Sequence, residues 1–74
     1  MVEVRIFGAL WEHLEPRLDL DLEEREFDVA DLLDHLDIDP AEVGIVTVNR
    51  RQSNLDEIVP AEGHVCIFPP MFGG

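Results

Sequence analysis

Residues 18–36 read LDLDLEEREFDVADLLDHL, and their hydrophobic period changes midway. In the first part leucine alternates with aspartate, which is the period of two of a β-strand with one buried face. In the second part apolar residues follow the i, i+3, i+4, i+7 stripe of an amphipathic helix, at Val29, Leu32, Leu33 and Leu36. Because Asp28 is a suitable N-cap and Asp31 adds negative charge where the helix dipole favours it, the stretch predicts a strand followed by a helix.

Further strands are predicted on both sides of this stretch from alternating or β-branched residues. With the strand already described, they cover residues 2–7, 18–22, 45–48 and 64–68. Turns are predicted at 49–52 and 60–63, with a short strand or irregular segment between them, and a short helical turn at 9–14. Pro40 is expected to prevent continuation of the helix, and Pro69-Pro70 to end the last strand.

This order of elements indicates an α+β domain, in which one helix crosses one face of a mixed sheet of four to five strands. The β-grasp fold has this order at this length, and its first and last strands pair in parallel at the centre. The apolar faces of the strands and of the helix then meet in one core. Its expected members are Val2, Val4, Ile6, Leu18, Leu20, Leu22, Val29, Leu32, Leu33, Leu36, Val65 and Ile67.

The composition limits the possible partners and compartments. The chain has 74 residues, which is enough for one domain, and its single cysteine, Cys66, cannot form an internal disulfide. The formal net charge is -12, and all the basic residues are arginine. Such a chain is expected to be repelled by nucleic acid and anionic membranes and attracted to a basic protein surface. Equally, the acidic residues could keep a small domain soluble or reflect a source cell with a salty cytoplasm. Without a visible export signal or a long apolar run, we expect a cytoplasmic protein.

The last seven residues carry the candidate chemistry. After Pro69-Pro70 the chain cannot re-enter a sheet ladder, so we expect a β-grasp domain at 1–70 and a flexible tail at 71–74. Gly73 and Gly74 contribute nothing to a core and cost entropy when they are ordered. Their physical use is access, because a tail without Cβ atoms can pass through a narrow channel and present a carboxylate to a reactive centre.

The ending Phe68-Pro69-Pro70 followed by Gly73-Gly74 resembles that of the MoaD/ThiS family of ubiquitin-like sulfur carriers. The proline pair is more similar to the molybdopterin synthase small subunit, MoaD, than to the thiazole carrier, ThiS. The resemblance extends over essentially the whole chain. Similar proteins often have Asn-Gly where this sequence has Asn49-Arg50, and a smaller pair where it has Met71-Phe72.

The resemblance implies a reaction that other proteins perform on this chain. An adenylyltransferase of the ubiquitin-activating type (MoeB/ThiF-like) would use ATP to adenylate the carboxylate of Gly74, and a sulfurtransferase would convert it to a thiocarboxylate. The large subunit of molybdopterin synthase (MoaE-like) would then take the sulfur for molybdenum cofactor biosynthesis. Gly73, Phe72 and Met71 would thread the tail into these partners. On this view the chain binds no cofactor or metal and is no enzyme by itself.

Other residues have weaker functional interpretations. Phe7 and Phe68 are expected to lie side by side on the sheet face away from the helix and, with Pro69 and Pro70, to form an exposed partner-binding patch unless Trp11 or a loop covers that face. Arg50 and Arg51 are interpreted as a solvated turn or a docking point. Cys66 is interpreted as a small apolar filler rather than a persulfide relay. The histidines, at positions 13, 35 and 64, lack metal-ligand spacing and are expected at the surface.

Two alternatives remain open at this stage. The chain could be a sulfur carrier for another pathway (thiazole, cysteine or tRNA thiolation) or a ubiquitin-like modifier of other proteins, which would gain from having no lysine of its own. It could also be a non-covalent β-grasp interaction module without tail chemistry. The sequence therefore defines the fold more narrowly than the pathway.

Overall fold

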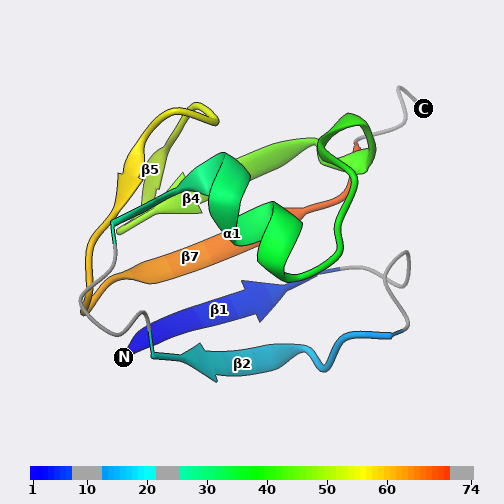
Figure 1. Cartoon of the computed structure of the whole chain (residues 1–74). Helices are drawn as coiled ribbons and strands as arrows, with labels where there is room; N and C mark the ends of the chain where they lie inside the picture. Colours follow the sequence, from blue (N-terminus) through cyan, green and yellow to red (C-terminus); the bar gives the residue numbers. More distant parts are fainter. Residues whose placement is uncertain (8–12, 22–25, 71–74) are drawn as a thin grey trace.

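The computed structural model describes residues 1–7, 13–21 and 26–70 (Figure 1). The predicted turn at 9–14 lies mostly outside these residues, and Trp11, Leu22 and the tail at 71–74 lie wholly outside them. The elements in chain order are β1 (Val2–Ile6), β2 (Arg17–Leu20), β3 (Phe27–Asp28), α1 (Val29–His35), a 3₁₀ helix (Pro40–Glu42), β4 (Ile45–Val48), β5 (Arg51–Gln52), β6 (Ile58–Val59) and β7 (His64–Phe68). None of the helices in the described residues has the length and hydrophobicity of a membrane span.

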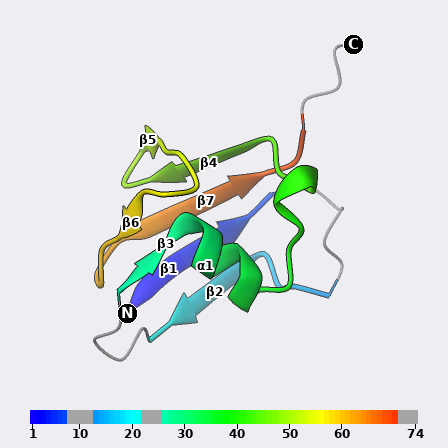
Figure 2. The same cartoon turned by 45° about the horizontal axis from the view of Figure 1, so that its top comes forward.

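The main sheet has five strands in the order β2-β1-β7-β4-β5. β1 and β7 pair in parallel at its centre, and the other neighbours pair antiparallel. α1 crosses one face of this sheet, and β3 and β6 form a separate two-stranded ribbon beside the helix (Figures 1 and 2). The predicted β-grasp arrangement is therefore confirmed, including its central parallel pair.

The start of α1 is fixed by a reciprocal capping interaction. The Asp28 carboxylate accepts the backbone N–H of Asp31 at 2.7 Å, and the Asp31 carboxylate accepts the backbone N–H of Asp28 at 3.1 Å. Two N–H groups that the helix itself cannot satisfy thus find partners. The predicted N-cap is confirmed, and Asp31 does more than add charge to the first turn.

The end of α1 differs from the prediction. Asp37 adopts a left-handed conformation (φ 58°) and donates its N–H to the Asp34 carbonyl, while Ile38 donates to the Leu33 carbonyl. This pair of bonds is a Schellman motif, which terminates the helix and turns the buried Ile38 into the core. The helix therefore stops before Pro40 is reached, and Pro40 instead begins the 3₁₀ helix.

The core lies between α1 and the main sheet. Every predicted core residue in the described part of the chain is buried or, for Leu18 and Leu20, partly buried against it. Full burial of a side chain such as Leu32 or Leu33 contributes about 1.5–3 kcal/mol of hydrophobic stabilisation. The prediction missed five buried residues, which are Phe27, Ile38, Val46, Val48 and Val59. Phe27 and Val59 belong to the small ribbon, whose strands are too short to show a period.

The predicted turn at 49–52 is confirmed for its first two residues and wrong for the last two. Only Asn49 (φ 52°) and Arg50 (φ 70°) form the turn, and their left-handed conformations match the two-residue hairpin turn that suits the twist of paired strands. Arg51 and Gln52 return as β5 and pair with Val48 and Thr47. The turn at 60–63 is confirmed, since Gly63 donates its N–H to the Pro60 carbonyl at 3.0 Å.

Candidate functional site: the open face of the sheet

The sheet face opposite α1 carries side chains from every other position of the strands, and we call it the open face. On β1 the even-numbered residues are buried, whereas Glu3 is half-buried and Arg5 is exposed. Because paired residues in neighbouring strands point to the same side, the strand register extends this face across the sheet. Its polar members include Arg17 and Asp19, which are opposite Arg5 and Glu3 respectively.

An apolar row crosses the open face where the chain leaves the sheet. The rings of Phe7 and Phe68 are stacked, with centroids 4.6 Å apart and an angle of 9° between their planes. Ile45 is opposite Phe68 in the register. Phe7 and Ile45 remain 40% and 37% exposed. We call these three residues the aromatic row, and the predicted placement of Phe7 beside Phe68 is confirmed. An exposed apolar group of this kind suits contact with another protein.

The chain exit lies beside the aromatic row and depends on Gly44. The N–H of Gly44 donates to the Phe68 carbonyl at 2.9 Å. A Cβ atom at Gly44 would lie 2.5 Å from the Pro69 oxygen and 2.7 Å from the Pro70 Cα, which are closer than real Cβ contacts. Pro69 and Pro70 are themselves half-buried. Gly44 was missed by the sequence analysis, and the only signal was a glycine directly before the β-branched strand at 45–48.

Glu3 lies at the centre of an ionic group on the open face. Its carboxylate accepts a hydrogen bond from Arg5 Nε at 2.9 Å and lies 3.4 Å from an Arg17 guanidinium nitrogen and 3.5 Å from His64 Nδ1. The hydrogen bond from Arg5 has the largest effect and lowers the pKa of Glu3, desolvation opposes it, and the weaker effects of the charges of Arg17, Arg5 and His64 lower the pKa further. Glu3 thus offsets the repulsion between two arginines that are opposite each other in the sheet.

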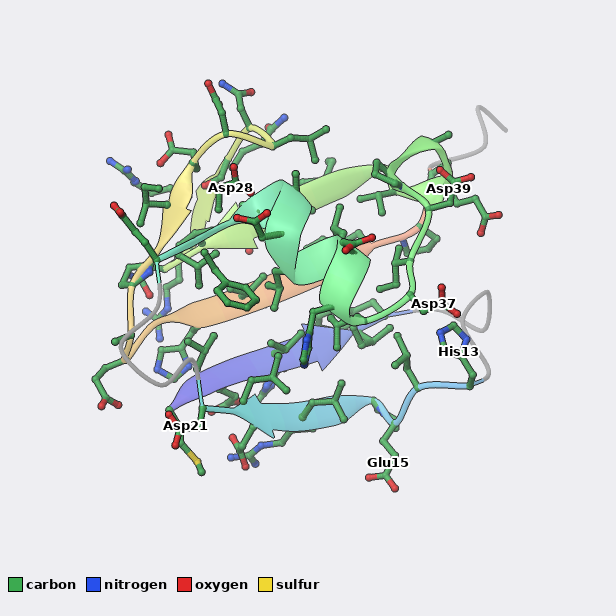
Figure 3. The ribbon with its side chains drawn as sticks, viewed as in Figure 1. His13, Glu15, Asp21, Asp28, Asp37 and Asp39 are labelled. Atoms are coloured by element: carbon green, nitrogen blue, oxygen red, sulfur yellow. The ribbon has the colours of Figure 1, made fainter. Side chains whose placement is uncertain are left out.

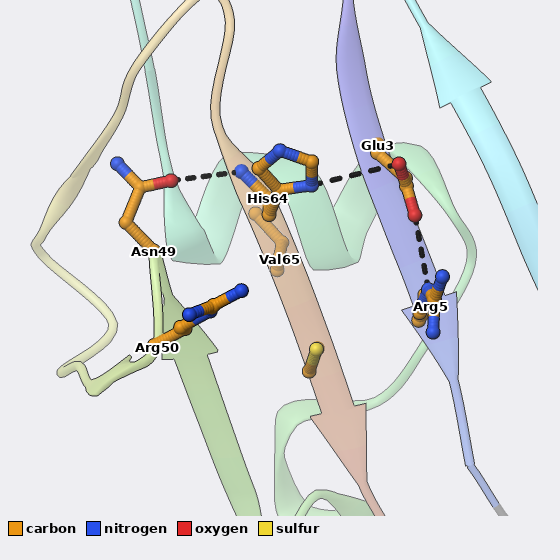
Figure 4. Close-up of a pocket in the computed structure, with 7 residues that line it drawn as sticks. Glu3, Arg5, Asn49, Arg50, His64 and Val65 are labelled. Carbon is orange, nitrogen blue, oxygen red and sulfur yellow. Dashed lines mark hydrogen bonds and ion pairs between the residues drawn. The ribbon is translucent and has the colours of Figure 1, made fainter.

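A pocket of about 470 Å³ opens beside this ionic group (Figure 4). Its lining residues are Glu3, Arg5, Asn49, Arg50, His64, Val65 and Cys66. The Asn49 side chain accepts the backbone N–H of His64 at 2.9 Å and so ties the β4–β5 turn to the start of β7. From that turn the Arg50 side chain extends toward β7, over the pocket. The pocket is therefore lined by two arginines that are distant in sequence, Arg5 from β1 and Arg50 from the β4–β5 turn.

The remaining candidate residues have simpler roles. All three histidines are exposed, and the described residues contain no group of side chains that could hold a metal ion. His13 Nε2 is 3.2 Å from the Leu36 carbonyl, at the end of the helix. Cys66 is half-buried on the open face, opposite Arg5 and Thr47 in the register, so it does not fill the core. Gly73 and Gly74, with Met71 and Phe72, are outside the described residues.

The architecture places the chain in the class of ubiquitin-like β-grasp proteins. Among solved structures it is similar to SAMP1 from Haloferax volcanii, with 25% identity, a TM-score of 0.67, and coverage of 99% of this chain and 98% of that one. A second structure of small archaeal modifier protein 1 from H. volcanii is 24% identical over 95% of this chain and 97% of that one, with a TM-score of 0.67. The HVO 2177 protein of H. volcanii, solved in solution, is 23% identical over 99% and 85%, with a TM-score of 0.61.

No protein-family model matches the sequence, and neither does any curated protein. The likeness therefore comes from three-dimensional structure, and it extends over nearly the full length of this chain. At this level it supports a ubiquitin-like carrier or modifier.

Proposed function

We propose that this chain is a sulfur carrier whose C-terminal carboxylate, on Gly74, is activated by a partner enzyme and converted to a thiocarboxylate. The observation that supports the proposal most directly is the exit of the chain. The central strand β7 ends at Phe68, and Pro69 and Pro70 follow beside the aromatic row. A partner that covers the aromatic row would thereby also lie next to the segment from which the tail departs.

The proposed reaction uses the tail as a substrate. The Gly74 carboxylate attacks the α-phosphate of ATP in the adenylyltransferase and releases pyrophosphate, which leaves an acyl adenylate. A persulfide on the sulfurtransferase then attacks the acyl carbon and displaces AMP. Cleavage of the resulting disulfide by a second thiol leaves the thiocarboxylate on Gly74. ATP is used by the partner, and we propose molybdopterin synthesis, through a MoaE-like large subunit, as the destination of the sulfur.

Protein modification is the second candidate function. Two similar structures are small archaeal modifier proteins, and this chain has no lysine that could capture its own activated tail. Both functions begin with adenylation of the same carboxylate. They differ only in whether a sulfur or an amine of another protein receives the acyl group.

Mass spectrometry of the protein isolated from its own cells separates these functions. Replacement of one terminal oxygen by sulfur indicates a carrier, and Gly-Gly remnants on lysines of other proteins indicate a modifier. A tail that is always unmodified would contradict both and would favour a non-covalent interaction module.

Deletion of Gly73 and Gly74 is the matching variant. We expect loss of adenylation by the partner enzyme with unchanged thermal stability, because the tail begins after the half-buried Pro69 and Pro70. Asp34→Ala serves as the control, since it leaves the tail and the aromatic row intact and lies on the exposed side of α1, so it is expected to be adenylated as the wild type is. Equal activation of the deleted and full-length proteins would refute the role of Gly74.

A further inference from the structure

The open face is the part of this acidic protein where arginines gather. Arg5, Arg17 and Arg50 lie on it or over it, and among the described residues that pair between β1 and β2 the acids on this face are Glu3 and Asp19. Asp28, Asp37 and Asp39, in contrast, lie on the side that carries α1 (Figure 3). The molecule is therefore divided into an acidic side around the helix and an open face on which positive charge is not outnumbered. Such a division attracts and orients a charged partner.

Arg50 is the least satisfied of these arginines. Arg5 and Arg17 both contact Glu3, whereas no hydrogen bond or ion pair joins the Arg50 side chain to any other described residue. Its backbone is also left-handed (φ 70°), a conformation that favours glycine and that costs energy for arginine. A charged side chain at a strained position, without a partner among the residues that the structure describes, favours a role in binding.

The pocket and the aromatic row are adjacent along the strands. Arg5, on β1, lies two residues before Phe7, which directly follows that strand, and Cys66 lies two residues before Phe68 on β7. Positions two apart on a strand are about 6.6–6.8 Å apart, which is also the spacing of alternate side chains in an extended peptide. An extended segment that places an apolar side chain on the aromatic row therefore carries a second side chain, two residues away, over the pocket.

We propose that the open face binds an extended segment of a partner protein, in which an apolar residue and an acidic residue are two positions apart. The apolar side chain contacts Phe7, Phe68 and Ile45. The carboxylate enters the pocket and accepts hydrogen bonds from the guanidinium groups of Arg50 and Arg5, whose fork geometry matches a carboxylate. The net charge of -12 favours a peptide partner over nucleic acid. It repels a long polyanion strongly, but it repels a segment with a single carboxylate much less.

The test is an NMR titration of the ¹⁵N-labelled full-length chain with the peptide acetyl-Val-Thr-Glu-Thr-amide. We expect shifts confined to the residues around the aromatic row and the pocket, which are the amides of Arg5, Phe7, Ile45, β7 and the β4–β5 turn and the Arg50 side chain. Replacing the glutamate of the peptide by glutamine is expected to weaken binding about tenfold, because a charge-assisted hydrogen bond is lost. Acetate alone is expected to bind several times more weakly than the peptide, because it cannot contact the aromatic row.

Two neighbouring arginines provide the matched variants. Arg50→Gln is expected to weaken peptide binding about tenfold, whereas Arg51→Gln, with the same loss of charge in the adjoining strand, is expected to leave it nearly unchanged. Arg50→Gly keeps the turn in a conformation that glycine prefers, so it is expected to fold at least as stably as the wild type and still to lose binding. Equal affinities for the Arg50 and Arg51 variants would overturn the proposal.

Inorganic phosphate, an oligonucleotide and acetate test whether the pocket prefers a different ligand. Tighter binding of inorganic phosphate or of single-stranded oligothymidylate than of the peptide would show a phosphate site and would overturn the proposal. Acetate binding as tight as that of the peptide would do the same, since the aromatic row would then have no part. The proposal is independent of tail chemistry, so the protein lacking Gly73 and Gly74 is expected to bind the peptide as the full chain does.

Discussion

Replacing Gly44 with alanine would test whether the close packing of the chain exit is required for the fold. The new Cβ would lie 2.5 Å from the Pro69 carbonyl oxygen, 2.7 Å from the Pro70 Cα and 2.9 Å from the Pro69 carbonyl carbon. All three are backbone atoms, so no side-chain rotation can relieve the overlap. The exit segment must move away from the start of β4 and weaken the hydrogen bond between Gly44 and Phe68.

The expected loss of stability follows from two opposing effects. Inserting a methyl group into a closely packed site costs about 1–3 kcal/mol. Replacing glycine by alanine recovers about 0.4–1 kcal/mol, because the unfolded chain becomes less flexible. We therefore expect Gly44→Ala to reduce the free energy of unfolding by about 1–2 kcal/mol, which lowers the Tm of a domain of this size by roughly 5–15 °C.

Thermal unfolding followed by circular dichroism would measure this loss, with Gly63→Ala as the control. A Cβ at Gly63 would approach Pro60 no closer than 3.2 Å, so its neighbours need to yield much less and a smaller decrease is expected. The amide shifts of Ile45 and Phe68 are expected to change in Gly44→Ala alone. A Tm equal to that of the wild type, with those shifts unchanged, would refute the reasoning about the exit.

Two further predictions concern single side chains. Asp28→Ala removes the helix cap and is expected to cost about 1 kcal/mol in urea unfolding, whereas Asp34→Ala, on the exposed side of α1, is expected to cost less; equal losses would contradict the capping role. Glu3→Gln concerns pH. Because the pKa of Glu3 is lowered from 4.5 in the folded state, its contribution is present above the unfolded pKa and is lost as the pH falls through the folded pKa. The variant is therefore expected to be less stable than the wild type near pH 7 and equally stable in acid; a pH-independent difference would show that the ionic group is not responsible.

Much of the fold could be predicted because its signals are local. The strands at 45–48 and 64–68 were placed at the bounds the structure shows, since β-branched or alternating residues cover their whole length. The end of the helix could not be predicted in the same way. Asp37 adopts its left-handed conformation because the Schellman bonds and the burial of Ile38 require it, and neither is visible in the sequence.

The candidate site was only partly predictable. Alternation gave the sheet face of Phe7 and Phe68, and the strand order of the β-grasp fold gave their adjacency, so together they were enough to place Phe7 beside Phe68. The pocket could not be predicted without the strand register, because the register places Arg5 of β1 and Arg50 of the β4–β5 turn in the lining of the same pocket. Arg50 was interpreted as part of a four-residue turn, and that interpretation concealed its position over the sheet. The role of Gly44 required the backbone path of Pro69 and Pro70.

The central position of β7 also has a consequence for biosynthesis. β1 cannot pair with its parallel neighbour, and β4 can pair only with β5, until residues 64–68 have left the ribosome, so the five-stranded sheet is completed by contacts between distant parts of the chain. A truncated or stalled product lacks the middle strand, so Phe7 has no Phe68 ring to stack on and the N–H of Gly44 has no Phe68 carbonyl to bind. Under the proposed function, an activating enzyme that recognises the completed sheet would not act on such a product.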